Sequence, residues 1–228
     1  MPDQTQRDRA DRILDAAGEL LLTLGYRKVT IDDIAGRARI GKGTVYLHWR
    51  TKGQLFQALI GRESVQLTDE VIGVLAGDAA EVRPHRLLRT LFLATEKRPL
   101  IKAVVSADAE VLGELLDSPL GKQDALASAE FFALMRRHGL LRDDVPNLDY
   151  TTQAAMSGFF LLDRQPQEAA ALDPEARAEG LAHTVRAAFE PAGEPAPEVL
   201  AAAAPEVAAA FRRMRDDVDP LIYSHDPR

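Results

Sequence analysis

Residues 41–49 carry side chains whose types and spacing suit contacts with a polyanion. The polar members of this short stretch are Lys42, Thr44, Tyr46 and His48. At helical spacing Val45 and Trp49 are four residues apart and share one face, so they are expected to point inward and leave the polar side chains on or beside the outer face. Ammonium, hydroxyl and imidazole groups on such a face can reach phosphates and base edges, and Gly43 would let a sugar-phosphate chain approach the backbone.

The stretch just before it has the signals of another short helix and a turn. Thr30 can cap the helix, and Asp33 stands three residues on in the reciprocal capping position. The apolar residues that follow recur at helical spacing and are Ile31, Ile34, Ala35 and Ala38. The turn is expected at residues 39–41, where Gly41 can adopt backbone angles that other residues avoid. Together the two helices predict a helix-turn-helix for the DNA major groove.

Two longer helices should support this motif. Residues 8–24 repeat apolar side chains with the rhythm of a half-buried helix, and residues 51–75 continue the chain after the motif. Thr51 and Gln54 form a second capping pair. Lys52 stands where helix amides and a cation can jointly hold a phosphate, so it is a candidate DNA contact.

The ordered run from Thr30 to Phe56 resembles the N-terminal signature of the TetR family of bacterial transcriptional regulators. The resemblance covers residues 9–60. It implies that the first three helices bind DNA, that the remaining helices bind a small ligand and dimerise, and that the ligand releases DNA. Two positions depart from the family pattern, with Arg39 in place of a turn glycine and Gly53 in place of an acidic residue.

The candidate DNA-binding residues are Thr30, Arg39, Gly41, Lys42, Gly43, Thr44, Tyr46, His48 and Lys52. For Tyr46 and His48 a second interpretation stays open, in which they seal the small core beside Trp49. Trp49 itself is assigned to the core.

Composition fits an ordinary soluble globular protein, with 46% hydrophobic and 28% charged residues. Because cysteine is absent, disulfides, thiolate metal sites and thiol catalysis are excluded, which fits a cytoplasmic location. No apolar run approaches the roughly 20 residues of a membrane span. The net charge is −7, but residues 1–55 hold ten basic against seven acidic residues, so the first 55 residues carry +3 and the remainder −10. This distribution favours DNA at the N-terminal end, although +3 is also an ordinary surface charge.

The rest of the chain reads as helices separated by proline and glycine. Residues 77–84 are expected to form a loop and residues 191–197 a linker. The expected helices cover residues 84–96, 100–116, 119–138, 148–163 and 174–190, with an alanine-rich tail helix over 198–217 interrupted at Pro205. The prediction is an all-α protein of about nine or ten helices, divided into residues 1–53 for DNA binding, 54–190 for effector binding and dimerisation, and 191–228 as linker and tail.

Two further residue sets are predicted in the helical body. Apolar residues that could line an effector cavity, or simply form core, are Leu88, Phe92, Val104, Phe131, Phe132, Met135, Met156, Phe159 and Phe160, with Asp108 as a polar anchor. Small and apolar residues suited to close helix packing in a dimer are Ala154, Ala155, Gly158, Leu162, Leu181, Val185 and Ala188.

With the helix-turn-helix, the resemblance implies a homodimeric repressor that a small-molecule effector releases. Such a dimer would read a palindromic double-stranded operator with half-sites about 34–36 Å apart. An alternative keeps the fold and the DNA but has no small-molecule effector, with control by a protein partner or by abundance. An enzyme is a third reading, which the absence of a nucleophile motif, a phosphate-binding glycine loop and a dinucleotide fingerprint disfavours. The five histidines are scattered, so neither a metal nor a cofactor is expected.

Overall fold

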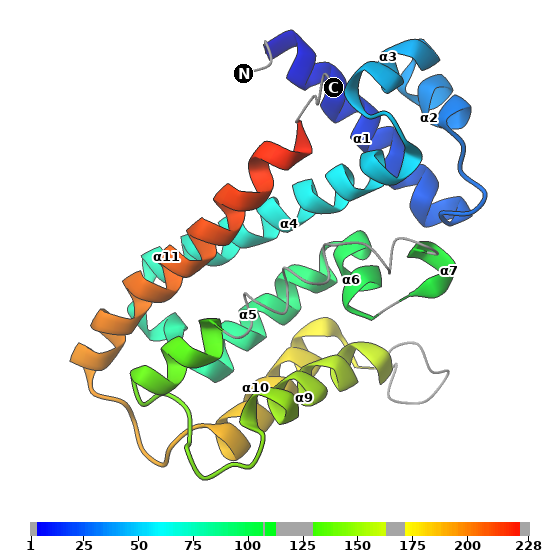
Figure 1. The fold of residues 1–228 in the computed structure, drawn as a ribbon. Coiled ribbons are helices and arrows are strands. Elements are labelled where there is room, and N and C mark those ends of the chain that lie inside the picture. The colour runs from blue at the N-terminus through cyan, green and yellow to red at the C-terminus, as the bar shows by residue number, and fades with distance from the viewer. Residues whose placement is uncertain (1–3, 107, 113–129, 163–171, 224–228) are drawn as a thin grey trace. The chain divides into compact units, whose positions relative to one another are not determined.

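The computed structural model describes residues 4–106, 108–112, 130–162 and 172–223 (Figure 1). Every regular element in these ranges is a helix, which confirms the all-α prediction. The chain divides into two compact units. Unit 1 comprises residues 1–66, 99–121 and 215–228, and unit 2 comprises residues 67–98 and 122–214, so neither is a continuous stretch. The linear boundaries expected at residues 53 and 190 therefore do not coincide with the compact units.

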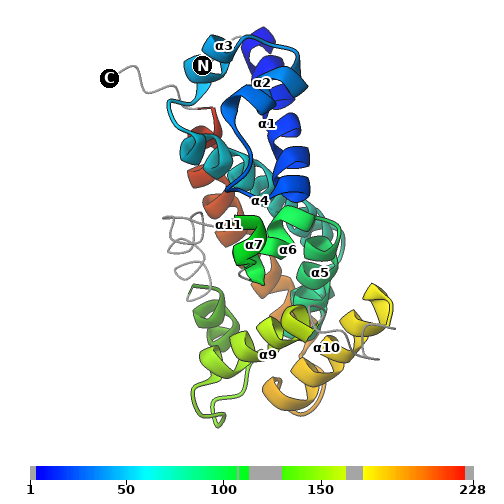
Figure 2. The same ribbon diagram turned by 90° about the vertical axis from the view of Figure 1, so that its right-hand side faces the viewer.

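Unit 1 is built on three N-terminal helices that pack on one another (Figures 1 and 2). These are α1 (Gln4–Leu24), α2 (Ile31–Ala38) and α3 (Lys42–His48). The first part of α4 (Lys52–Gly77), the short helices α6 (Pro99–Val105) and α7 (Ala109–Leu112), and the end of α11 (Pro197–Ile222) complete the unit. Ile13, Leu14 and Leu21 of α1 are fully buried, as the apolar rhythm of that helix predicts.

Unit 2 is a helical body with one apolar core. Its elements are the second part of α4, the 3-10 turn η1 (Ala79–Val82), α5 (Pro84–Glu96), α9 (Leu148–Leu162), α10 (Pro174–Phe189) and the first part of α11. Residues 130–137 are also helical. Among the described pairs α10 packs most extensively on α5, and the two lie side by side in both views (Figures 1 and 2). Their shared face buries Leu87, Leu181 and Val185 completely.

Charged side chains fasten the two ends of this α5–α10 pair. At one end the Glu190 carboxylate accepts hydrogen bonds from the backbone N–H of His85, at 2.6 Å, and lies 2.8 Å from the imidazole Nδ1 of the same residue. At the other end the half-buried Arg177 donates to Glu96 at 2.9 Å. Since a buried charge is tolerated only with a partner, these pairs fix the register of α10 on α5.

Several elements differ from the sequence prediction. Helix α1 begins at Gln4, four residues before the predicted start at residue 8. The described part of the helix predicted over residues 100–116 is divided into α6 and α7, with Ser106 after the end of the first and Asp108 before the start of the second. Residues 113–116 of that prediction lie outside the described residues. The loop expected at residues 77–84 contains η1, which Asp78 caps. The predicted helix start at residue 119 lies outside the described residues.

The tail helix α11 is longer than predicted and runs through Pro205 without a break, from Pro197 to Ile222. The Pro205 ring is exposed to solvent. None of the helices in the described ranges is long and apolar enough to span a membrane.

Candidate nucleic-acid interface

Helix α2 starts as its sequence predicts. The Thr30 side chain accepts a hydrogen bond from the Asp33 N–H at 3.2 Å, and the Asp33 carboxylate accepts from the Thr30 N–H at 3.0 Å, which completes a capping box. The Thr30 hydroxyl also donates to Asp33 at 2.6 Å, and this bond is the main cause of a lowered pKa for the Asp33 carboxyl. The bond to Asp33 uses the only hydroxyl proton of Thr30. The Thr30 side chain can therefore accept a hydrogen bond from a water molecule or another donor at the DNA, but it cannot donate one to a phosphate.

The turn between α2 and α3 is made by Arg39 and not by Gly41. Arg39 has φ 56° and ψ 47°, in the left-handed region that side chains with a Cβ rarely adopt. Its N–H and that of Ile40 bond back to the last turn of α2, which closes the helix. Gly41 has φ −73° and ψ 142°, which any residue can adopt, so the predicted conformational role of Gly41 is wrong. The exposed Arg39 side chain remains beside the start of α3.

Helix α3 is held from behind by the two residues that the spacing predicts. Val45 is fully buried and Trp49, the C-cap of α3, is 5% exposed. Lys42, Gly43, Tyr46 and Leu47 are exposed, and we call these four residues the outer face of α3. A Cβ added to Gly43 would meet no protein atom within 4 Å, so its small size leaves room outside the protein. Thr44 and His48 are half-buried at the edges, and the His48 ring lies 5.4 Å from the Trp49 ring.

Leu47 is the outer-face residue that sequence reasoning missed. It is 62% exposed, more than Tyr46 at 44%. At 100° per residue, position 47 lies opposite the face shared by positions 45 and 49. The helical spacing that assigned Val45 and Trp49 to the core would also have found Leu47, but the prediction selected only polar residues and glycines.

The cations of the motif are held in two different ways. The Lys42 ammonium lies 2.7 Å from the Asp32 carboxylate in an exposed pair, and that hydrogen bond raises the pKa of Lys42. Lys52 instead turns inward. Its ammonium donates to the carbonyl oxygens of Tyr26, at 2.7 Å, and Val29, at 3.0 Å, and lies 4.2 Å from the centre of the Tyr26 ring.

Lys52 therefore holds the backbone of the segment between α1 and α2 in place. This geometry does not favour the predicted contact between Lys52 and a DNA phosphate. Two of its three N–H groups already satisfy backbone carbonyls. The cap that precedes it forms as predicted, since Thr51 and Gln54 exchange hydrogen bonds of 3.1 and 3.3 Å.

The residues predicted to line an effector cavity divide between the two units. Val104 and Asp108 belong to unit 1, where the Asp108 carboxylate caps α7 by accepting from the Val111 N–H at 3.2 Å. The other eight are in unit 2, and all of them are part of its core or packed against it. Phe92 stacks on Phe160 with ring centres 4.8 Å apart. In the described part of unit 2 the aromatic members of the predicted set therefore fill the core.

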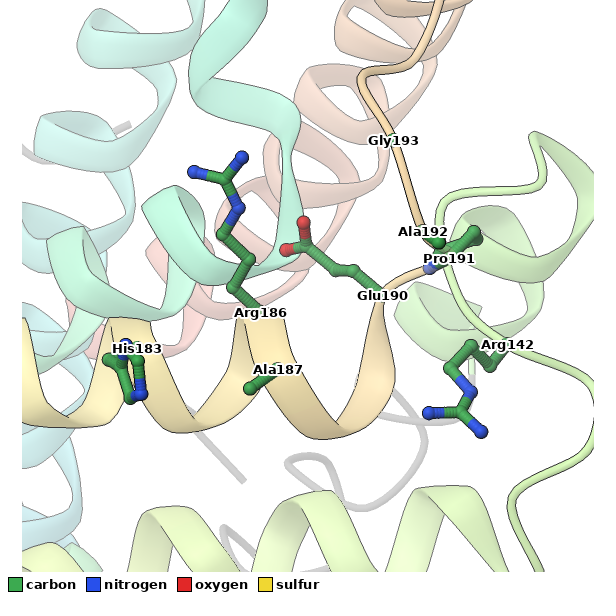
Figure 3. Close-up of a pocket in the computed structure, with 8 residues that line it drawn as sticks. All are labelled: Arg142, His183, Arg186, Ala187, Glu190, Pro191, Ala192 and Gly193. Atoms are coloured by element: carbon green, nitrogen blue, oxygen red, sulfur yellow. The ribbon is translucent and has the colours of Figure 1, made fainter.

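A cavity of about 810 Å³ does open on unit 2, at the end of α10 (Figure 3). It is lined by Arg142, His183, Arg186, Ala187, Glu190, Pro191, Ala192 and Gly193, none of which was predicted. Its two arginines are already paired, Arg142 with Asp144 at 2.8 Å and Arg186 with Glu194 at 2.5 Å.

The predicted dimer residues also need correction. Leu181 and Val185 are fully buried in the core of their own chain, because they face α5, and so they offer no surface to a second subunit. On α9 the surface is different. Ala154 and Leu162 are exposed there, Ala155 and Gly158 are half-exposed, and the neighbouring Leu161 is 46% exposed. Ala188 is half-buried on α10.

Comparison with known proteins agrees with this geometry. The sequence profile described as "Bacterial regulatory proteins, tetR family" matches residues 13–59, the helices α1 to α3 and the start of α4. The HTH-type transcriptional repressor KstR of Mycolicibacterium smegmatis is 32% identical over 120 residues, which is 49% of this chain and 58% of that protein. KstR of Mycobacterium tuberculosis is 30% identical over 56% of this chain and 62% of its own length. The matched region thus spans about three fifths of these curated relatives.

Two solved structures extend the likeness to the helical body. The fatty acid degradation regulator FadR from Bacillus halodurans superposes with a TM-score of 0.58 at 16% identity, over 78% of this chain and 94% of that one. NalD of Pseudomonas aeruginosa, a secondary repressor of the MexAB-OprM efflux pump, gives 0.56 at 22% identity, over 84% and 100%. Residues 13–59 thus match the tetR family of bacterial regulatory proteins, and the all-helical fold is similar to that of these two solved structures.

Proposed function

We propose that the chain is a transcriptional regulator that binds double-stranded DNA through α3 as a homodimer, represses from a palindromic operator, and is released by a small-molecule effector. The observation that carries this proposal is the outer face of α3, which presents a cation, an aromatic hydroxyl and an aliphatic side chain to solvent while Val45 and Trp49 anchor the helix from behind. A helix of this kind is what reads base edges in a major groove.

The charge distribution also supports the N-terminal segment as the surface that contacts DNA. Residues 1–55 carry +3 and the remainder −10. A cationic segment on an anionic chain is steered toward DNA in one orientation, and the attraction weakens as salt screens it.

The relatives support regulation over catalysis. Both KstR proteins are described as transcriptional repressors, and a further structural neighbour is described as a gamma-butyrolactone receptor, so binding of a small molecule has precedent in this fold. Within the described residues no group of three or more acidic or histidine side chains is arranged to hold a metal.

The exposed apolar strip of α9 supports the homodimer. It consists of Ala154, Ala155, Gly158, Leu161 and Leu162. Small residues let two helices approach closely, and leucine side chains exposed in a row are stabilised when a second surface covers them. Two subunits joined here would each contribute one α3 to a two-fold symmetric operator.

One observation favours a second candidate, a regulator of the same fold without a small-molecule effector. The aromatic side chains expected to line a cavity are packed together in the core of unit 2. Control would then come from a protein partner or from abundance.

Selection of bound duplexes from random-sequence DNA tests the proposal. A palindrome whose half-sites are about one helical turn apart is expected, together with a binding constant that falls steeply with salt. Recovery of no preferred sequence would contradict the DNA-binding proposal. Titrating the selected complex with a metabolite panel then separates the two candidates, because a compound that dissociates it supports the effector.

A further inference from the structure

The end of α11 is packed into unit 1 at a position where α4 has a glycine. Val218 is 8% exposed and Ile222 is 2% exposed. A Cβ on Gly61 of α4 would lie 3.2 Å from Val218 Cγ1 and 3.5 Å from Ile222 Cγ1. The first distance is shorter than ordinary van der Waals contact, so the close approach of α11 to α4 depends on Gly61 having no side chain.

The last residue of α11 is hydrogen-bonded to the residue that ends α3. The indole Nε1–H of Trp49 donates to the backbone carbonyl of Ile222 at 3.2 Å, in a buried position. Carbonyls in the last turn of a helix lack partners within the helix, so this bond satisfies a group that would otherwise be buried without one. It also fixes the indole, and with it the C-cap of α3.

Tyr223 fastens the same segment to α1. Its hydroxyl donates to the Asp11 carboxylate at 2.7 Å, and the Arg7 guanidinium lies 5.4 Å from the centre of its ring. Arg62 of α4 contributes from the other side, 3.5 Å from Asp11 and 2.8 Å from Asp15. The segment is therefore held by apolar contacts to α4, a hydrogen bond to Trp49 and polar contacts to α1.

We propose that residues 218–223, which are the end of α11 and the following Tyr223, are a positioning element that fixes helix α3 through Trp49. This inference rests on the proposed function, since it assigns a role in DNA binding. A helix already fixed in its binding geometry loses less conformational entropy when it meets DNA, so loosening its anchor weakens affinity without removing any DNA contact.

Adjacent residues on α11 supply a matched pair of variants. Ile222 is 2% exposed and Leu221 is 58% exposed, so Ile222→Ala disturbs the anchor and Leu221→Ala makes a similar truncation at the surface. Both are made in the full chain. The measurements are the dissociation constant for a duplex selected by the wild-type chain and the hydrogen exchange rates of backbone amides in α3 and in α10.

Ile222→Ala should weaken duplex binding about fivefold or more and speed exchange in α3, with α10 unchanged, whereas Leu221→Ala should change neither. Equal effects of the two variants, or an Ile222→Ala protein that binds within twofold of wild type, would overturn the proposal. A wild-type chain that selects no duplex would instead contradict the proposed function itself, so the two failures are distinct.

If Ile222→Ala does not fold, Trp49→Phe provides a milder test, because it keeps an aromatic ring in the core and removes only the indole and its N–H donor. Faster exchange in α3 with about threefold weaker binding supports the anchor. Unchanged exchange and affinity in Trp49→Phe would show that the bond to Ile222 does not position α3.

Discussion

The two lysines of the helix-turn-helix should behave in opposite ways when their charge is removed. Lys52→Met should lower the free energy of unfolding by about 1–3 kcal/mol, because the carbonyls of Tyr26 and Val29 lose their donor, and should leave the salt dependence of DNA binding unchanged. Lys42→Met should leave stability almost unchanged, since its pair with Asp32 is exposed, and should reduce the salt slope by about one.

Chemical denaturation and binding measured at several salt concentrations check both lysine variants. A loss of salt slope in Lys52→Met with no loss of stability would restore Lys52 as a phosphate contact.

Leu47 is predicted to contact a thymine methyl group in the major groove, because it is the most exposed apolar residue of α3. Replacing the contacted thymidine by deoxyuridine removes only that methyl group. Because burial of one such carbon contributes about 0.8 kcal/mol to the binding free energy, the replacement should weaken binding about fourfold. In Leu47→Ala the same replacement should have no effect. Leu22→Ala, a similarly exposed leucine on α1, serves as the control and should retain the full sensitivity. Equal sensitivity in Leu47→Ala would contradict the contact.

Tyr223 gives unit 1 an alkaline pH dependence. Burial and the nearby Asp11 raise the pKa of its hydroxyl to about 12, above the ordinary value of 10.0. A raised pKa means that the folded state favours the protonated phenol, so its stabilisation is complete below pH 10 and is lost as the pH rises toward 12. The difference in thermal unfolding between wild type and Tyr223→Phe should therefore shrink across this range. A difference that stays constant would show that Tyr223 is not protonated preferentially in the folded state.

At the scale of single elements, α11 is a helix that continues through a proline. Pro205 lies in its interior, where proline removes one backbone hydrogen bond and crowds the preceding turn. Buried Ala203, Ala204, Val207 and Ala208 hold this part of the helix on unit 2, and packing outweighs the local cost.

Pro205→Ala should raise the free energy of unfolding by about 2 kcal/mol. Proline in a helix interior costs about 3 kcal/mol relative to alanine. The substitution also makes the unfolded chain more flexible, which offsets about 1 kcal/mol of the gain in stability. Urea denaturation measures the change, with Pro197→Ala as a control at the first helical position, where proline is well tolerated. A Pro205→Ala protein no more stable than wild type would mean that α11 is kinked or relaxed around residue 205.

The break between α6 and α7 is an element boundary that periodicity alone could not predict. Apolar residues continue at helical spacing on both sides of residues 106–108, but Asp108 caps the second helix with its own side chain. Aspartate favours such a local bond over a helix interior. The capping box at Thr30 was predictable for the same reason, because both of its partners lie within four residues.

At the scale of the whole molecule, DNA affinity should depend on the α9 strip. Leu162→Glu places a charge on the exposed side chain and should shift the protein from dimer to monomer, because an unpaired carboxylate is costly in an apolar interface. Sedimentation velocity measures the shift, and binding to the selected palindrome should weaken at least tenfold as the second half-site is lost. Leu22→Glu is the control on unit 1. A Leu162→Glu protein that sediments like wild type would remove α9 from the interface.

The sequence by itself determined the helix-turn-helix, its caps and the inward direction of Val45 and Trp49. These features depend on residues within one or two helical turns, so local spacing contains the information. Only the tertiary structure decided that Lys52 points inward, that Arg39 makes the turn, that Leu181 and Val185 lie in the chain's own core, and that Trp49 bonds to Ile222. The bond between Trp49 and Ile222 joins residues 173 positions apart, and such partners are chosen by packing between elements, which no local pattern in a single sequence records.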